Sequence, residues 1–132
     1  MQLVSFLTHL VMLLMLAGLV SCKESQEDER SALELEKERI VLYAKSGQCI
    51  NDSQCRFVGL GSKPCGGPRM YLLYSASLDT TKLLTMISQY NAGEHSFNLK
   101  WGLGSDCSIP AAPDSVRCVE GVCVGYWNGV AR

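Results

Sequence analysis

The chain has 132 residues and a mass of 14.5 kDa, with 47% hydrophobic and 19% charged residues and a formal net charge of −1. This length is enough for one small domain and excludes a multidomain protein. Seven cysteines in so short a chain indicate a disulfide-stabilised protein of an oxidising compartment, and they argue against a cytosolic enzyme.

The N-terminal region carries an uncharged run, LVMLLMLAGLV, at residues 10–20. This run is shorter than the roughly 20 apolar residues of a transmembrane helix and has the length of the apolar part of a secretory signal. We therefore expect residues 1–21 to be a signal peptide that is removed. The usual positive charge is nearly absent, because the residues before the run contain no Lys or Arg.

The end of this region reads L-V-S-C from Leu19 to Cys22 and resembles the lipobox of bacterial lipoproteins. The resemblance implies cleavage before Cys22 and attachment of a diacylglycerol and an N-acyl chain to this residue. Several acyl chains hold a protein on a membrane where one chain is marginal. The alternative is a secreted protein with an odd cysteine. The remaining six cysteines can form three disulfides, and they are Cys49, Cys55, Cys65, Cys107, Cys118 and Cys123.

The charges of the mature chain are unevenly distributed. Residues 22–38 contain seven acidic and three basic residues and predict an acidic tether, whereas residues 39–132 contain six acidic and nine basic residues and form the cysteine-rich domain. The segment Gln26–Glu29 resembles the export signal of surface lipoproteins in Bacteroidetes-type bacteria; an acidic first turn of a helix is the alternative. We expect an outer-membrane lipoprotein of the bacterial cell envelope, on either the periplasmic or the exposed face.

Two helices and one strand are predicted in the first two thirds of the domain. Residues 27–46 lack Gly and Pro and predict a helix whose charged first half can act as a stalk. Residues 48–68 show no sustained period and predict a disulfide-tied loop, and residues 69–75 (RMYLLYS) predict a buried strand. Asp79 is a good N-cap for a helix of about 80–101, with a kink at Gly93 as an option.

The last third predicts a β-hairpin. Residues 116–119 and 122–126 flank Glu120-Gly121, a two-residue turn signal. In this register Cys118 faces Cys123, so these two are either bridged directly or both pin the hairpin to other parts of the domain. Cys49 with Cys107 is a candidate pair, and the sequence leaves the pairing open.

The predicted fold is a small, disulfide-stabilised α+β domain. Its short antiparallel sheet comprises about 69–75, 116–119 and 122–126, it packs with the helix of about 80–101, and the helix of about 27–46 precedes it. The cysteine pattern resembles small cysteine-rich bacterial lipoproteins, a resemblance that implies no particular activity.

The residues offer no evident catalytic set. His95 is the one histidine after the signal peptide, no nucleophile motif accompanies it, and the carboxylates are scattered. The cysteines lack zinc-type C-x2-C spacing, and Gly59–Lys63 does not match a phosphate-binding loop. We therefore expect no enzyme, no metal and no cofactor.

The segment Lys63–Met70 is the predicted binding loop. Two prolines and a cysteine stiffen it, so that it loses little entropy on binding, although any small scaffold needs such stiffness to fold. The basic residues Arg56, Lys63 and Arg69 could contact an anionic partner. Tyr126 and Trp127 form either a contact patch or a cover of the core.

These features predict a membrane-anchored exported lipoprotein with a small binding or interaction domain. The alternatives are a protease inhibitor that uses the Lys63–Met70 loop, a structural envelope lipoprotein, and a hydrolase based on His95. We expect as partners the membrane, through the lipid anchor, and a protein or an anionic polysaccharide, but no nucleic acid. We expect a monomer.

Overall fold

The computed structural model describes residues 25–131, and it has an α+β fold with three disulfides. The predicted signal peptide and the lipidation residue Cys22 lie outside the described residues. In chain order the elements are α2 (Gln26–Lys45), the 3-10 turn η1 (Asp52–Gln54), β1 (Cys55–Leu60), β2 (Met70–Ser75), α3 (Thr80–Lys100), β3 (Ser115–Val119), β4 (Val122–Trp127) and β5 (Val130–Ala131).

Helix α2 begins at a capping box. The Ser25 hydroxyl accepts a hydrogen bond from the backbone N–H of Asp28 at 3.1 Å, and the Asp28 carboxylate accepts one from the backbone N–H of Ser25 at 3.2 Å. The acidic half of the helix packs on α3: Glu29 accepts a hydrogen bond from the indole of Trp101 at 3.0 Å, and Leu33 packs against the core. The domain boundary expected at residue 39 therefore falls inside a packed helix.

Helix α3 starts where its cap predicts. The Asp79 carboxylate accepts a hydrogen bond from the backbone N–H of Lys82 at 3.0 Å. The helix is continuous through Gly93, the residue at which a kink was an option. A Cβ on Gly93 would lie 3.4 Å from Leu33 of α2, so the glycine lies where the two helices meet.

Strands β1 and β2 form an antiparallel hairpin with Cys55 opposite Ser75 and Leu60 opposite Met70. The strand at residues 70–75 was predicted, but the prediction that residues 48–68 form only a loop was wrong, because β1 lies within them. Val58 and Leu60 of β1 pack in the core, Cys55 is bonded to Cys123 of β4, and Arg56 and Phe57 are exposed. Buried and exposed residues do not alternate along this strand, and this hid it from the sequence analysis.

The C-terminal strands form a separate sheet in the order β3-β4-β5. The predicted hairpin register is confirmed, since Cys118 lies opposite Cys123 and Val119 opposite Val122. The prediction that this hairpin shares one sheet with residues 69–75 was wrong, because the partner of β2 is β1. The turn at Glu120 and Gly121 has φ angles of 49° and 82°, which favours glycine at the second position.

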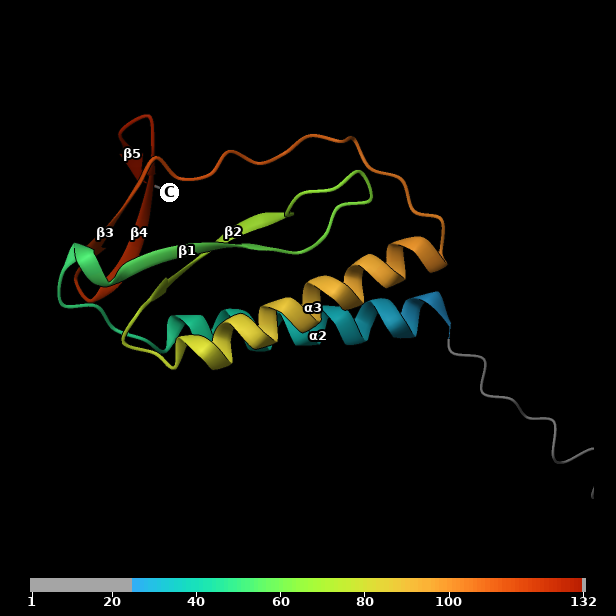
Figure 1. Cartoon of the computed structure of the whole chain (residues 1–132), viewed down its shortest axis with the longest axis horizontal. Coiled ribbons are helices and arrows are strands. Elements are labelled where there is room, and N and C mark those ends of the chain that lie inside the picture. Colours follow the sequence, from blue (N-terminus) through green and yellow to red (C-terminus); the bar gives the residue numbers. More distant parts are fainter. Residues whose placement is uncertain (1–24, 132) are drawn as a thin grey trace, which may run out of the picture.

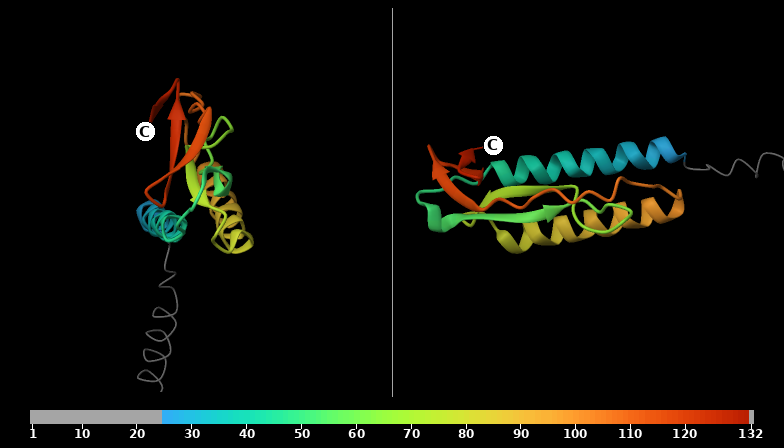
Figure 2. Two further views of the ribbon diagram at one scale, coloured as in Figure 1. Left: turned by 90° about the vertical axis from the view of Figure 1, so that its left-hand side faces the viewer. Right: turned by 90° about the horizontal axis from the view of Figure 1, so that it is seen from above.

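The elements form layers that share one core. Helices α2 and α3 run side by side in opposite directions against one face of the β1–β2 hairpin, and residues 101–114 return along its other side (Figures 1 and 2). The β3–β5 sheet lies at one end of the hairpin. The core comprises the buried residues Ile40, Ala44, Leu60, Leu72, Tyr74, Leu83, Ile87 and Tyr90.

The two adjacent leucines of α3 give a matched test of this core. Leu83 is 0% exposed and Leu84 is 43% exposed. We expect Leu83→Ala to lower the free energy of unfolding by about 2–5 kcal/mol, because it leaves a cavity, and Leu84→Ala to lower it by less than about 1 kcal/mol. Urea unfolding checks both values, and equal effects would contradict the packing.

Candidate functional site

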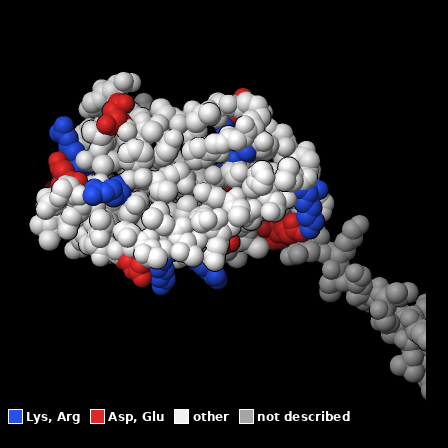
Figure 3. Space-filling view, in the orientation of Figure 1, with Lys and Arg blue, Asp and Glu red and all other residues white. Residues whose placement is uncertain are grey.

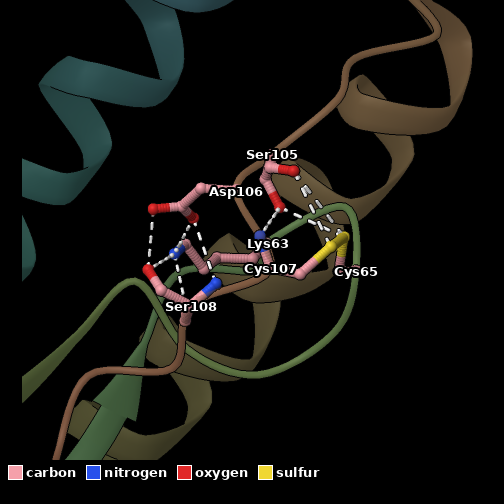
Figure 4. Close-up of a disulfide and its surroundings, with 6 residues drawn as sticks. All are labelled: Lys63, Cys65, Ser105, Asp106, Cys107 and Ser108. Carbon is pink, nitrogen blue, oxygen red and sulfur yellow. Dashed lines mark hydrogen bonds and ion pairs between the residues drawn. A yellow bond between two sulfur atoms is a disulfide. The ribbon is translucent and has the colours of Figure 1, made fainter.

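The predicted binding loop is fastened to the segment that follows α3. The Lys63 ammonium lies 2.8 Å from the Asp106 carboxylate and donates hydrogen bonds to the backbone carbonyl and the hydroxyl of Ser108. Figure 4 shows this cluster beside the Cys65–Cys107 disulfide. The Lys63 side chain is only 13% exposed, so its charge is used inside the domain.

The other two predicted basic residues also have partners within the domain. The guanidinium of Arg56 donates to the backbone carbonyls of Ser53 at 2.6 Å and Cys55 at 2.8 Å, and Arg69 forms an ion pair with Glu94. Arg56 lies at the start of the hairpin, whereas Lys63 and Arg69 lie at its other end. On the face shown in Figure 3, Lys and Arg side chains are scattered rather than gathered into one basic patch. The structure therefore does not bring the three residues into one site.

A row of polar side chains on α3 holds the turn after β1. Asn91 accepts a hydrogen bond from the backbone N–H of Gly61 at 2.7 Å. Glu94 accepts one from the backbone N–H of Ser62 at 2.6 Å, and Asn98 donates one to the Ser62 carbonyl at 2.7 Å. The sequence analysis missed this row, although its i, i+3, i+7 spacing places the three side chains on one face of the helix.

Gly61 permits this close approach. Its φ angle is +89°, and a Cβ there would lie 2.9 Å from both Cβ of Arg69 and Oε2 of Glu94. A side chain at this position would push Glu94 away from both the backbone and Arg69. The turn and the Glu94–Arg69 ion pair therefore form one unit. Glu94 is only 7% exposed, and each of its two carboxylate oxygens has a partner, the backbone N–H of Ser62 for one and the guanidinium of Arg69 for the other.

A cavity of about 290 Å³ lies beside this unit, between the two helices and the end of the hairpin. Burial, and then the nearby Glu94 carboxylate, raise the pKa of Tyr90 to about 12, so the phenol is neutral at ordinary pH. The cavity combines an apolar lining with groups of both charges. Its lining residues are Arg30, Leu33, Glu34, Lys37, Leu60, Gly61, Arg69, Met70, Tyr90, Glu94, Phe97 and Leu103.

The six predicted cysteines form three disulfides, Cys49–Cys118, Cys55–Cys123 and Cys65–Cys107. The direct bridge from Cys118 to Cys123 and the candidate pair of Cys49 with Cys107 were wrong. The alternative holds, in which both cysteines of the hairpin pin it to other parts of the domain. Two disulfides attach β3 and β4 to the residues around η1, and the third joins the two long loops at the other end of the hairpin.

The remaining candidate residues lie apart from the cavity. His95 is exposed on α3, and no hydrogen bond found within residues 25–131 joins it to a Ser or Cys nucleophile. Trp127 is half-buried and donates a hydrogen bond from its indole to the carbonyl of Ala111 at 2.9 Å. The guanidinium of Arg117 lies 5.1 Å from the ring centre of Tyr126. The hydrogen bond from Trp127 to Ala111 fastens the 101–114 segment to the C-terminal sheet.

The chain matches no family model, and no similar sequence among curated proteins and no similar fold among solved structures is found. In the described part of the chain, neither long helix has an apolar stretch that could cross a bilayer.

The three disulfides differ in exposure, and this predicts the order of their reduction. Cys65 and Cys107 are exposed, whereas Cys49 and Cys55 are 5% and 2% exposed. We expect a limiting dithiol to reduce Cys65–Cys107 first, because the attacking thiolate must reach a sulfur. Alkylation followed by peptide mass spectrometry identifies the first pair. Earlier labelling of Cys55 or Cys123 would contradict this order.

The pH dependence of the loop fastening follows from Asp106. Hydrogen bonds from Lys63 and then Ser108 lower the pKa of Asp106 from 3.8 to about 2. A carboxylate with a lowered pKa stabilises the folded state above about pH 4, and this contribution is lost as the pH falls towards 2. We expect Lys63→Met to move the NMR titration midpoint of Asp106 up towards 3.8.

A matched control comes from the other end of the chain. The pKa of Glu29 is lowered by its hydrogen bond with Lys100 and then by that with Trp101. Lys100→Met should therefore raise the midpoint of Glu29 and leave that of Asp106 unchanged. An Asp106 midpoint that stays low in Lys63→Met would show that the ammonium does not cause the shift.

Proposed function

We propose that the chain is an exported bacterial lipoprotein, anchored through acyl chains on Cys22, whose disulfide-stabilised domain is a ligand-binding module. The pairing of the six other cysteines with one another carries the first part of this proposal. The six cysteines of the described residues are all paired, so none of them is left to form a disulfide with Cys22 of the L-V-S-C sequence. Lipid attachment gives this odd cysteine a use.

The anchor also fits the direction of α2. The helix begins at Gln26, four positions after Cys22, and Glu29 and Trp101 fasten its first turns to the end of α3. At 1.5 Å per residue, a helix of 20 residues extends about 30 Å. An anchored domain would therefore present this end, with the cavity close to it, towards the membrane and the β3–β4 hairpin away from it.

The binding part of the proposal rests on the cavity next to the Glu94–Arg69 pair. Its volume of about 290 Å³ and its mixture of apolar and charged walls suit a small amphipathic molecule with an anionic group. Lys37 pairs with Glu34 and Arg69 with Glu94, whereas Arg30 lies over the ring of Phe97 and has no carboxylate partner among the described residues. The fixed turn at Gly61 means that this wall is organised before a ligand binds.

The protease-inhibitor alternative is less well supported. An inhibitor would have to place a basic side chain of the Lys63–Met70 loop in the specificity pocket of a protease. The Lys63 ammonium instead contacts Asp106 and Ser108, and Arg69 pairs with Glu94. Freeing either cation would break contacts that hold the loop.

Lipid attachment is tested by the intact mass of protein from the membranes of its own host, before and after reduction. We expect a mature chain that starts at Cys22, carries acyl groups and gains about six daltons on reduction of three disulfides. A Cys22→Ala variant should lose the acyl mass and leave the membrane fraction. An unlipidated wild-type chain would contradict the proposal.

Ligand binding is tested with anilinonaphthalene sulfonate, a dye with apolar rings and one anionic group. Leu103 lines the cavity, whereas Ile109 lies in the same segment, is 66% exposed and does not line it. We expect the dye to bind the wild type, Leu103→Trp to weaken binding at least about tenfold by filling the cavity, and Ile109→Trp to leave it unchanged. Absence of binding, or equal loss in both variants, would exclude the cavity as the site.

A further inference from the structure

Two of the three disulfides lie against each other. The Sγ atoms of Cys49, Cys55 and Cys123 are all within 4.8 Å of one another. Cys118 is disulfide-bonded to Cys49, so a fourth sulfur atom lies next to this group. The bonded partners are 69 and 68 residues apart in the sequence, and the fold brings the Cys-x5-Cys segment against the Cys-x4-Cys hairpin.

Hydrogen bonds that do not involve sulfur also hold the cluster together. The backbone N–H of Cys49 donates to the Gly121 carbonyl at 2.9 Å, and that of Cys118 donates to the Asp52 carboxylate at 2.8 Å. These bonds connect the residues around η1 to both sides of the β3–β4 turn. They can keep the four cysteines close together after their disulfides are reduced.

We propose that the four cysteines form a zinc-binding site when both disulfides are reduced. Zinc takes four thiolates in a tetrahedron with Zn–S distances of about 2.3 Å, which places the sulfurs about 3.8 Å apart. The Sγ atom of Cys49 is already within 4.8 Å of those of Cys55 and Cys123. The Sγ atom of Cys118, which is bonded to Cys49, has to rotate towards the other two. A disulfide holds its two sulfurs about 2.05 Å apart, so each bonded pair must separate by less than about 2 Å. Side-chain rotation supplies such movements.

The electron and proton balance of this change is simple. Each disulfide takes two electrons and two protons from one dithiol reductant, which becomes a cyclic disulfide, and gives two thiols. The four thiols lose four protons when they bind one Zn²⁺. Metal binding removes the repulsion between four thiolates that would otherwise share a largely buried place, since Cys49 and Cys55 are 5% and 2% exposed. Zinc binding therefore depends on the redox state of the two disulfides. The site does not depend on the proposed lipid anchor or on the ligand cavity.

The third disulfide provides an internal control. Cys65 and Cys107 join the loops at the other end of the β1–β2 hairpin and belong to no such cluster. A variant without Cys65 and Cys107 and a variant without Cys55 and Cys123 each lack two thiols. The two variants therefore differ only in where in the fold the thiols are removed.

The experiment uses the full chain with Cys22→Ser, reduced by a dithiol that is then removed without oxygen. Co²⁺ serves as a spectroscopic probe, and Zn²⁺ affinity is measured by competition with a chromophoric chelator. We expect one metal per chain, with the visible bands of tetrahedral cobalt–thiolate coordination and a folded circular dichroism spectrum. Cys65→Ser/Cys107→Ser should keep the affinity within about threefold, and Cys55→Ser/Cys123→Ser should lower it at least about 100-fold.

Three results would overturn the proposal. The first is a reduced chain that shows no tetrahedral thiolate spectrum. The second is an equal loss of affinity in both double variants, which would mean that the place of the thiols does not matter. The third is metal binding by a chain whose circular dichroism stays that of an unfolded protein, because scattered thiols of an unfolded chain then account for it.

Discussion

The attachment of the β3–β4 hairpin to the residues around η1 is the constraint on which the rest of the domain depends. The C-terminal sheet shares no strand with the β1–β2 hairpin, so backbone pairing does not hold the two sheets together. Cys49–Cys118 and Cys55–Cys123 make this connection across 69 and 68 residues of sequence. A disulfide that closes a long loop removes more conformational entropy from the unfolded chain than one that closes a short loop, and so stabilises the fold more. A core of two helices and two strands in so short a chain benefits from such cross-links.

The other end of the domain is fixed by different chemistry. Asn91, Glu94 and Asn98 hold the turn after β1 by direct hydrogen bonds to its backbone. Lys63 and the Cys65–Cys107 disulfide then fasten the same loop to the segment after α3. Lys63 and Arg69, which the sequence analysis assigned to binding, have ion-pair partners within the domain. The cavity lies at this same end, beside Tyr90.

The sequence predicted what local chemistry controls. Asp79 marks the start of α3, and Glu120-Gly121 determines the register that places Cys118 opposite Cys123. It did not predict β1, because buried and exposed residues do not alternate along this strand. It did not predict the partners of the cysteines, because those depend on the packing of distant segments. It did not identify the polar row of Asn91, Glu94 and Asn98 on α3, although the spacing of these residues places them on one face of the helix.

Disulfide mapping tests the central claim most directly. The native protein is digested without reduction at a pH that prevents exchange, and the linked peptides are identified by mass spectrometry. The account predicts peptides that join Cys49 to Cys118, Cys55 to Cys123 and Cys65 to Cys107. A peptide in which Cys118 is joined to Cys123 within the hairpin would contradict it, because nothing covalent would then connect the C-terminal sheet to the residues around η1.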